Sequence, residues 1–421
     1  MRTPSNDAGD GEILSAAWVA PVSGGILREG AVVMREGRIA AVGPADSVRS
    51  QYPGAMETEL GEAVLLPGLV NAHAHLELSS VERPSRPGSF VEWLGATMSQ
   101  TLAKARDASY FVEAAQAGVK QSLNGGGTSV GDVSGSPFVR EIRAALAGGH
   151  CRVTSYGEVT AMAQRRRRLE DRIAVATDAS AIAPPVRMAI SPHAPYSIEG
   201  AGYRRCLEVA RSLHLPIMTH LAETPYEGEF LASHSGPFRR LWDAMKAWDD
   251  EVPTFRGGPI RYADTLGLLD YSRTLLAHVN YCDDAELGIL AGGKASVAYC
   301  PRTHEYFGHP PHRFREMLGA GINVALGTDS CASSPDLNFV EELRLVHRIA
   351  PELPVETIWE MGTIRGAKAI GADDVGSLAV GKRADVVAFA VRTKEPLREI
   401  LDSGVVPSGV WVGGRRVEPG V

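Results

Sequence analysis

Eight short apolar segments alternate with longer segments of helical periodicity, and this alternation restricts the fold of the 421-residue chain more than any other feature. Short apolar runs bounded by polar residues are typical of buried strands, and strands that alternate with helices form parallel sheets. Eight strand–helix units close into a (β/α)8 barrel. The strands are expected at residues 64–70, 128–133, 153–158, 187–191, 216–219, 274–277, 295–299 and 323–327. Helices are expected at 90–105, 110–123, 203–213, 283–290 and 338–349, among others.

The two ends of the chain have a different pattern. Residues 12–60 and 381–415 contain short alternating or apolar runs separated by glycines, which predicts small β-strands joined by tight turns. We expect the two ends to pair into one small β-sandwich beside the barrel. The predicted domains are residues 1–62 and 373–421 for the two parts of the β-sandwich and 63–372 for the barrel.

Composition excludes several classes of protein. No apolar run reaches the roughly 18 residues that a membrane-spanning helix needs. Residues 1–9 lack the apolar segment of a signal peptide, and the five cysteines include no CxxC pair, so a cytoplasmic location is expected. The net charge of -7 gives no general attraction to nucleic acid or anionic lipid. The expected partner is a small-molecule substrate, and a homodimer is compatible with the sequence.

Polar side chains collect where the barrel strands end, which is where barrel enzymes have their active sites. The chain places His73 and His75 after the first strand, His220 after the fifth and Asp329 after the eighth. Alternate residues of a strand point to the same side, so both histidines of the HxH motif can face the barrel axis. Three imidazoles and one carboxylate with an open position are typical of a catalytic zinc or a similar divalent ion.

Two further residues at the strand ends suit proton transfer. Glu223 follows His220 by three residues, and a carboxylate beside a metal site can move protons between water and a substrate nitrogen. Its structural alternative is a glutamate that stabilises a helix start. His278 can be a further metal ligand or can stabilise a charged transition state, and its structural alternative is a buried core histidine.

The ordered motifs PGLVNAHAH, SPHAPYS, THLAET, AHVNY and LGTDS resemble the amidohydrolase superfamily, in particular its adenosine and cytosine deaminase-like branch. The resemblance covers nearly the whole chain and implies a barrel with a flanking β-sandwich from both termini. It also implies one metal ion, zinc or iron. The residues implied as metal ligands are His73, His75, His220 and Asp329, and those implied in proton transfer and catalysis are Glu223, His278 and Asp329. Binuclear members carry a carboxylated lysine, and this chain has no lysine at the corresponding strand ends, which favours one metal.

The segments HAHLELS and CPRTHEYFGH are similar to a group within this branch called aminodeoxyfutalosine deaminases. The resemblance implies hydrolytic deamination of a 6-aminopurine nucleoside in an alternative route of menaquinone biosynthesis. Many relatives have Ser-Asn where this chain has Arg302-Thr-His304, so other substrates stay open. The alternatives are S-adenosylhomocysteine, methylthioadenosine, adenosine, guanine, cytosine and triazine-like rings. Hydrolysis of a cyclic amide or a ring-chlorine bond, and a non-catalytic binding protein on the same fold, are the rival functions.

Candidate substrate contacts follow from the same resemblance. His193 in SPHAPYS is similar to a position that binds the ribose or base. A benzoate on the substrate would require an arginine, either Arg302 or one of residues 165–168, although a run of four arginines is also typical of a solvated helix face. The remaining candidates are Glu77, Glu92, Trp93 and His304. The alternatives are an exposed loop carboxylate for Glu77, helix packing for Trp93 and a role in loop structure for His304.

Overall fold

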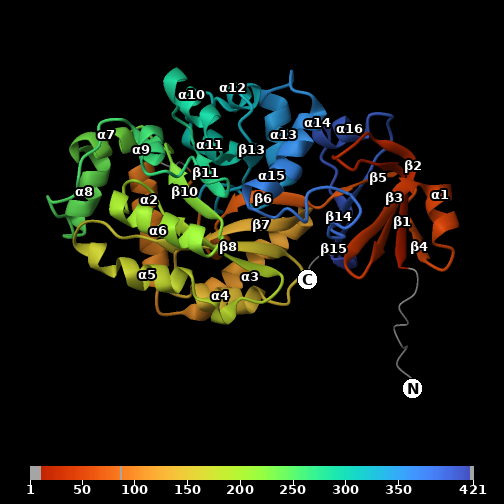
Figure 1. The fold of residues 1–421 in the computed structure, drawn as a ribbon, viewed down its shortest axis with the longest axis horizontal. Helices are drawn as coiled ribbons and strands as arrows, with labels where there is room; N and C mark the ends of the chain where they lie inside the picture. Colours follow the sequence, from red (N-terminus) through yellow and green to blue (C-terminus); the bar gives the residue numbers. More distant parts are fainter. Residues whose placement is uncertain (1–10, 86–87, 418–421) are drawn as a thin grey trace.

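The computed structural model describes residues 11–85 and 88–417, so the polar segment 1–9 lies outside the described residues. The described chain contains two eight-stranded sheets, one in the barrel and one in a smaller unit beside it (Figure 1). Among the described residues, no helix is both long and apolar enough to cross a lipid bilayer.

The first of these sheets is the barrel, and its eight strands follow one another in chain order with every neighbouring pair parallel. The last strand returns to the first through a parallel bridge between Ala74 and Asp329. The backbone N–H of Asp329 donates to the carbonyl oxygen of His73 at 3.0 Å in the same place. The predicted (β/α)8 barrel is therefore confirmed. Its strands are β6(Leu69–Ala74), β7(Gly127–Ser134), β8(Arg152–Val159), β9(Val186–Pro192), β10(Ile217–Leu221), β11(Thr274–His278), β12(Ser296–Tyr299) and β13(Val324–Leu326).

Burial explains why these segments form strands. Every residue of β6, β7, β10, β11, β12 and β13 is buried, as expected for parallel strands that are covered on both faces. A separate apolar cluster fills the barrel interior, and many of its members are small, including Ala72, Ala189, Ala277 and Ala298. The interior is packed with apolar side chains, so the strand ends are the place to look for polar chemistry.

Helices surround the barrel strands, and the five predicted helices are present with ends shifted by a few residues. Ser89 and Glu92 form a capping box at the start of α2, which stabilises a helix that borders the site. The helices of the barrel region are α2(Phe90–Ala103), α3(Ala108–Asn124), α4(Val139–Leu146), α5(Leu169–Ala176), α6(Gly200–Ser212), α7(Tyr226–Ser233), α8(Gly236–Ala244), α9(Pro259–Thr265), α10(Asp284–Gly292), α11(Pro301–Phe307), α12(Phe314–Gly319), α13(Val340–Ile349), α14(Val355–Met361) and α15(Ile364–Ala369). Short helices α1(Ala45–Gln51) and α16(Pro396–Asp402) lie nearer the two ends of the chain.

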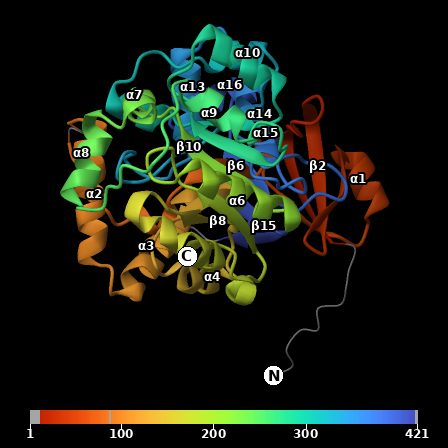
Figure 2. The ribbon, with the colours of Figure 1, turned by 60° about the vertical axis from the view of Figure 1, so that its left-hand side comes forward.

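The smaller unit joins both ends of the chain, as predicted. Its strands form one hydrogen-bonded sheet in the order β16-β15-β14-β5-β1-β2-β3, with β4 paired to β1. The C-terminal β14 pairs with the N-terminal β5, as Figure 1 shows, and Figure 2 shows the N-terminal strands on the right of the barrel. The strands are β1(Glu12–Val19), β2(Leu27–Arg35), β3(Arg38–Pro44), β4(Met56–Glu59), β5(Ala63–Pro67), β14(Val386–Ala390), β15(Pro407–Val412) and β16(Arg415–Val417).

One predicted strand, residues 64–70, proved to be two. The apolar run is divided at Gly68, so that β5 pairs with β14 in the smaller sheet and β6 begins the barrel. A Cβ at Gly68 would lie 2.1 Å from Oγ1 of Thr128, so only glycine fits where the chain crosses between the units. The predicted domain boundaries at residues 62 and 372 stay predictions.

Candidate functional site

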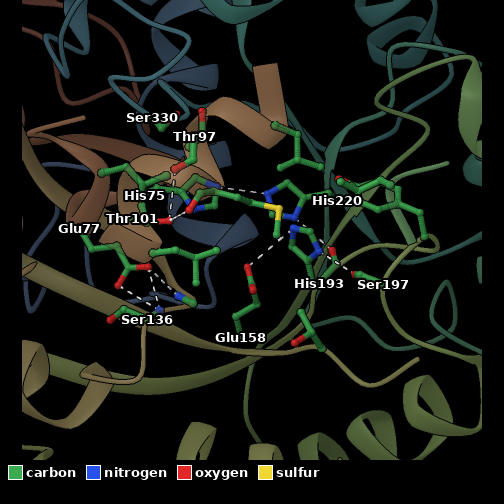
Figure 3. A pocket seen from close by; sticks show the side chains of 18 of the residues that line it. His75, Glu77, Thr97, Thr101, Ser136, Glu158, His193, Ser197, His220 and Ser330 are labelled. Carbon is green, nitrogen blue, oxygen red and sulfur yellow. Dashed lines mark hydrogen bonds and ion pairs between the residues drawn. The ribbon is translucent and has the colours of Figure 1, made fainter. Parts of the chain in front are cut away.

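A cavity of about 380 Å³ opens at the C-terminal ends of the barrel strands. Polar residues from several strand ends line it, and α2 and α8, which contact each other, supply apolar side chains to its wall. Figure 3 shows the polar side chains that converge there. Labelled there are His75, Glu77, Glu158, His193 and His220, and the cavity lining also includes Glu223 and Asp329.

The four predicted metal ligands lie together beside this cavity. One ring nitrogen from each of His73, His75 and His220 lies within 4.8 Å of the other two. The Nε2 atoms of His75 and His220 are 3.2 Å apart. Oδ1 of Asp329 lies 3.7 Å from Nε2 of His73 and 3.6 Å from Nε2 of His75. The fold therefore gathers three imidazoles and one carboxylate from β6, β10 and the end of β13.

The unsatisfied nitrogens of this cluster fit a divalent metal ion. His73 is fully buried, and neither of its ring nitrogens has a hydrogen-bond partner. Such a group costs about 1–3 kcal/mol unless something binds it. Burial lowers the pKa of all three histidines, so their imidazoles are neutral and their lone pairs are free to bind a cation. Imidazole and carboxylate are ligands that zinc and similar divalent ions accept.

Neighbouring groups orient these side chains. Nδ1 of His220 lies 3.1 Å from the carbonyl oxygen of His193, which can only accept, so Nδ1 carries the proton and Nε2 faces the cluster. The hydroxyl of Ser333 donates to Oδ2 of Asp329 at 3.1 Å. The amide of Asn71 donates to Oγ1 of Thr328 at 2.7 Å and so links the start and end of the barrel next to the site.

The backbone is unusual at two of the candidate site positions. His278 has a φ of 73° and Asp329 a φ of 59°, although neither is glycine. Such left-handed residues cost about 1–3 kcal/mol each and concentrate at functional sites. His312, which sequence analysis gave no role, donates from Nε2 to the carbonyl oxygen of His278 at 2.8 Å and helps to hold this conformation.

Glu223 and His278 form a buried pair beside the cluster, with Oε1 of Glu223 3.4 Å from Nε2 of His278. Burial, with the charges of Asp329 and Glu227 added, raises the pKa of Glu223 well above its usual range. Glu227 accepts the backbone N–H groups of Ala222 and Glu223 at 2.8 and 2.7 Å, which fixes the loop. A buried carboxyl group with a raised pKa is therefore presented to the cavity.

Three of the predicted substrate contacts line the cavity. His193 faces it from the end of β9, and Trp93 lines it from α2 while its Nε1 donates to the carbonyl oxygen of Ala332 at 2.7 Å. The Glu77 carboxylate also lies on the lining, but Ser134 Oγ and the backbone N–H groups of Gly135 and Ser136 already donate to it at 2.8–3.0 Å.

The other three predicted contacts are not brought into the cavity, which corrects the expectation. Arg302 is held by Glu342 and Asp336, with Nη1 2.7 Å from Oδ1 of Asp336. His304 Nε2 donates to the carbonyl oxygen of Pro310 at 2.9 Å. The Glu92 carboxylate closes the capping box of α2 on the exposed side of that helix. In each case a local polar partner satisfies the side chain.

Sequence analysis missed Glu158 and Arg172 as lining residues and did not separate Arg165 from its neighbours. Glu158 is the next-to-last residue of β8, and His193 directly follows β9, so the strand-end rule would have found Glu158 as well. Within the arginine run, Arg165 lines the cavity, whereas Arg166 pairs with Glu199 and Asp249. Only the packing of α5 and its preceding turn distinguishes these arginines.

Comparisons with known proteins agree with this geometry. A model of the "Amidohydrolase family" matches residues 64–417, and a model of an "Imidazolonepropionase-like composite domain, bacteria" matches residues 30–55. Aminodeoxyfutalosine deaminase of Deinococcus radiodurans is 30% identical, with 83% of each chain covered. 5-Methylthioadenosine/S-adenosylhomocysteine deaminase of Nitratidesulfovibrio vulgaris is 28% identical over 87% of this chain and 80% of the relative.

The fold is also similar to a solved structure of an adenosine deaminase from Xanthomonas campestris with bound zinc. The TM-score is 0.79 at 24% identity, covering 96% of this chain and 92% of that one. The family model spans the whole barrel and the C-terminal strands β14, β15 and β16. The chain therefore belongs to the amidohydrolase family.

Proposed function

We propose that this protein is a metal-dependent hydrolytic deaminase that acts on a 6-aminopurine nucleoside. The observation that supports the proposal most is the buried Glu223, which lines a cavity beside three imidazoles and Asp329 that lie within metal-binding distance of one another. Relatives at 28–30% identity that are named deaminases of aminodeoxyfutalosine and of methylthioadenosine or S-adenosylhomocysteine support the same class of reaction.

The metal would be held by His73, His75, His220 and Asp329. Zinc is the proposed ion, with iron as the alternative, because neutral imidazoles and a carboxylate suit either. When bound, a divalent ion lowers the pKa of water and so supplies a nucleophile near neutral pH. His278 lies close enough to this cluster to serve as a further ligand, but its contact with Glu223 favours a role in the proton transfers.

Glu223 performs the first proton transfer in this proposal. Its raised pKa keeps a proton on the carboxyl group, and it donates that proton to a ring nitrogen of the aminopurine. Protonation makes the adjacent amino-bearing carbon electrophilic, and water adds to that carbon. The ionised Glu223 then receives a proton from the attacking water and passes it to the departing amino group, so that ammonia leaves.

Asp329 and His278 assist the same steps. Burial raises the pKa of Asp329 to about 7, so its carboxylate can accept a proton from the attacking water. Burial lowers the pKa of His278 well below its usual range, so the imidazole is neutral. A neutral imidazole can donate one hydrogen bond to the oxygen on which charge develops.

Two arginines favour a substrate with an anionic tail. Arg165 and Arg172 line the cavity, and among the described residues neither has a carboxylate within ion-pair distance. Arg165 instead lies over the ring of Trp242, with its guanidinium carbon 5.4 Å from the ring centroid. Unpaired guanidinium groups are suited to bind a carboxylate. We therefore rank aminodeoxyfutalosine, which carries a benzoate, above S-adenosylhomocysteine, and both above methylthioadenosine and adenosine.

The experiment that tests the proposal compares these four nucleosides with zinc-loaded protein and follows adenine absorbance and ammonia release together. Release of one ammonia per nucleoside consumed is the expected result. Ring opening or chloride release from other cyclic substrates, with no ammonia from any nucleoside, would contradict deamination and support the rival hydrolyses. Assembly as a homodimer and a cytoplasmic location stay predictions.

A further inference from the structure

Glu158 is a half-buried carboxylate of the cavity that the proposed reaction does not use. It is the next-to-last residue of β8, its side chain is 16% exposed, and it points toward the middle of the cavity in Figure 3. Its nearest polar partner among the described residues is Nε2 of His193 at 3.8 Å, which is too long for a hydrogen bond. No N–H or O–H of the described chain reaches it within hydrogen-bond distance.

The neighbouring Glu77 shows what a satisfied carboxylate looks like in the same wall. Three donors from residues 134–136 occupy its two oxygens. Gly135 lies between the two glutamates, and a Cβ there would be 2.7 Å from Oε1 of Glu158. The chain therefore leaves room for the Glu158 carboxylate but gives it no donor, which is costly unless a ligand supplies one.

His193 faces Glu158 with a lone pair. The hydroxyl of Ser197 donates to the carbonyl oxygen of Ala194 at 3.0 Å, which uses its single hydrogen. The 2.7 Å contact between Ser197 Oγ and Nδ1 of His193 then requires a proton on Nδ1. In the neutral ring, a proton on Nδ1 leaves Nε2 without a hydrogen. Two acceptors thus face each other across the cavity.

We propose that Glu158, together with Nε2 of His193, binds the vicinal hydroxyl groups of the substrate's pentose, which makes Glu158 the residue that selects ribonucleosides. Two adjacent hydroxyls can donate to the two oxygens of one carboxylate, and hydrogen bonds to a charged acceptor are the strong ones. The inference rests on the proposed nucleoside function.

The position of Glu158 agrees with this role. The rings of His193 and His220 are 4.9 Å apart, so His193 joins the histidine cluster to Glu158. His220, Glu158 and Arg172 all line the same cavity. A nucleoside whose base lies at the histidine cluster and whose tail reaches Arg172 has its pentose between them.

The test measures binding by calorimetry to zinc-loaded protein, with inosine and 2′,3′-dideoxyinosine as ligands that have no amino group to lose. The wild-type protein is expected to bind inosine about 10- to 100-fold more tightly, because two hydrogen bonds to a charged group are lost with the hydroxyls. In Glu158→Gln, which has the same shape, the ratio should fall to about 3-fold or less. The ratio of kcat/KM for adenosine and 2′,3′-dideoxyadenosine should change in parallel.

Glu113→Gln is the matched control, since Glu113 is an exposed residue of α3, and it should keep the wild-type ratio. Glu158→Asp retains the charge but shortens the side chain by one methylene. If the glutamine variant does not fold, the aspartate variant replaces it in the same binding measurement. A glutamine variant that keeps the full preference for inosine would overturn the role of Glu158 while leaving the deaminase proposal intact. Wild-type protein that neither binds inosine nor releases ammonia from any aminopurine nucleoside would overturn both.

Discussion

Replacement of Arg302 by methionine should destabilise the protein strongly and leave substrate binding nearly unchanged. The guanidinium is 10% exposed and donates to Glu342, to Asp336 Oδ1 at 2.7 Å, and to the carbonyl oxygens of Asp336 and Asn338 at 2.8 and 3.2 Å. Glu342 is fully buried. Arg302→Met removes its only ion-pair partner among the described residues, and a buried charge left without its partner typically costs about 3–5 kcal/mol.

Denaturant unfolding at pH 7 measures this loss, with Arg205→Met as the control. Arg205 pairs with Glu170 and Glu208 on the surface, where a lost ion pair costs about 0.2–1 kcal/mol. Adding Glu342→Leu to Arg302→Met should recover much of the loss, because the uncompensated charge is then removed. An Arg302→Met protein that unfolds like the wild type but has a strongly raised KM would refute this reasoning and restore Arg302 as a substrate contact.

The loss of stability in Arg302→Met should also depend on pH. Burial raises the pKa of Glu342 above its ordinary value of 4.5 even with Arg302 present, and removal of the arginine raises it further. A group whose pKa is higher in the folded state binds protons more readily when folded, so the variant gains stability relative to the wild type as the pH falls. The deficit is complete above the raised pKa of Glu342 and disappears as the pH falls toward and below 4.5.

Three further predictions concern the site. Glu223→Gln should lower kcat by about 10²- to 10⁴-fold with zinc content and melting temperature retained, and unchanged turnover would exclude Glu223 from proton transfer. Zinc added to metal-free protein at 100 times its dissociation constant should raise the free energy of unfolding of the wild type by about 2.7 kcal/mol and leave that of His73→Ala unchanged. A wild-type melting temperature that does not change on addition of zinc would reject the metal site. Arg172→Gln should raise KM about 10-fold or more for carboxylate-bearing nucleosides while sparing methylthioadenosine, and equal effects on both would remove the anionic-tail argument.

The sequence alone predicted the barrel and the residues grouped at its inner end. Most of the eight strands contain a local apolar run, and the pattern of such runs does not depend on distant residues. His73, His75, His220 and Asp329 were found because they follow such runs and because parallel strands bring their carboxyl ends to one side. Glu223 and His278 were found by the same rule, and the structure places them 3.4 Å apart.

The outer part of the site was less predictable, because a side chain's partners decide its role there. Arg302 and Glu92 were expected to contact substrate, yet Glu342 and Ser89 hold them elsewhere. Glu77 and Glu158 are chemically alike in the sequence, and only the donors around residues 134–136 show that one is satisfied and the other is not.

The sequence by itself therefore determined the barrel, the pairing of the two chain ends and the identity of the residues that gather at the strand ends. The tertiary structure decided where one apolar run divides between two sheets, which arginines face the cavity and which carboxylate is left for a ligand. Strand periodicity is a local property, since it follows from the alternation of side chains along one segment. Hydrogen-bond satisfaction is a property of neighbours that are distant in the chain, and it exists only once the chain has folded.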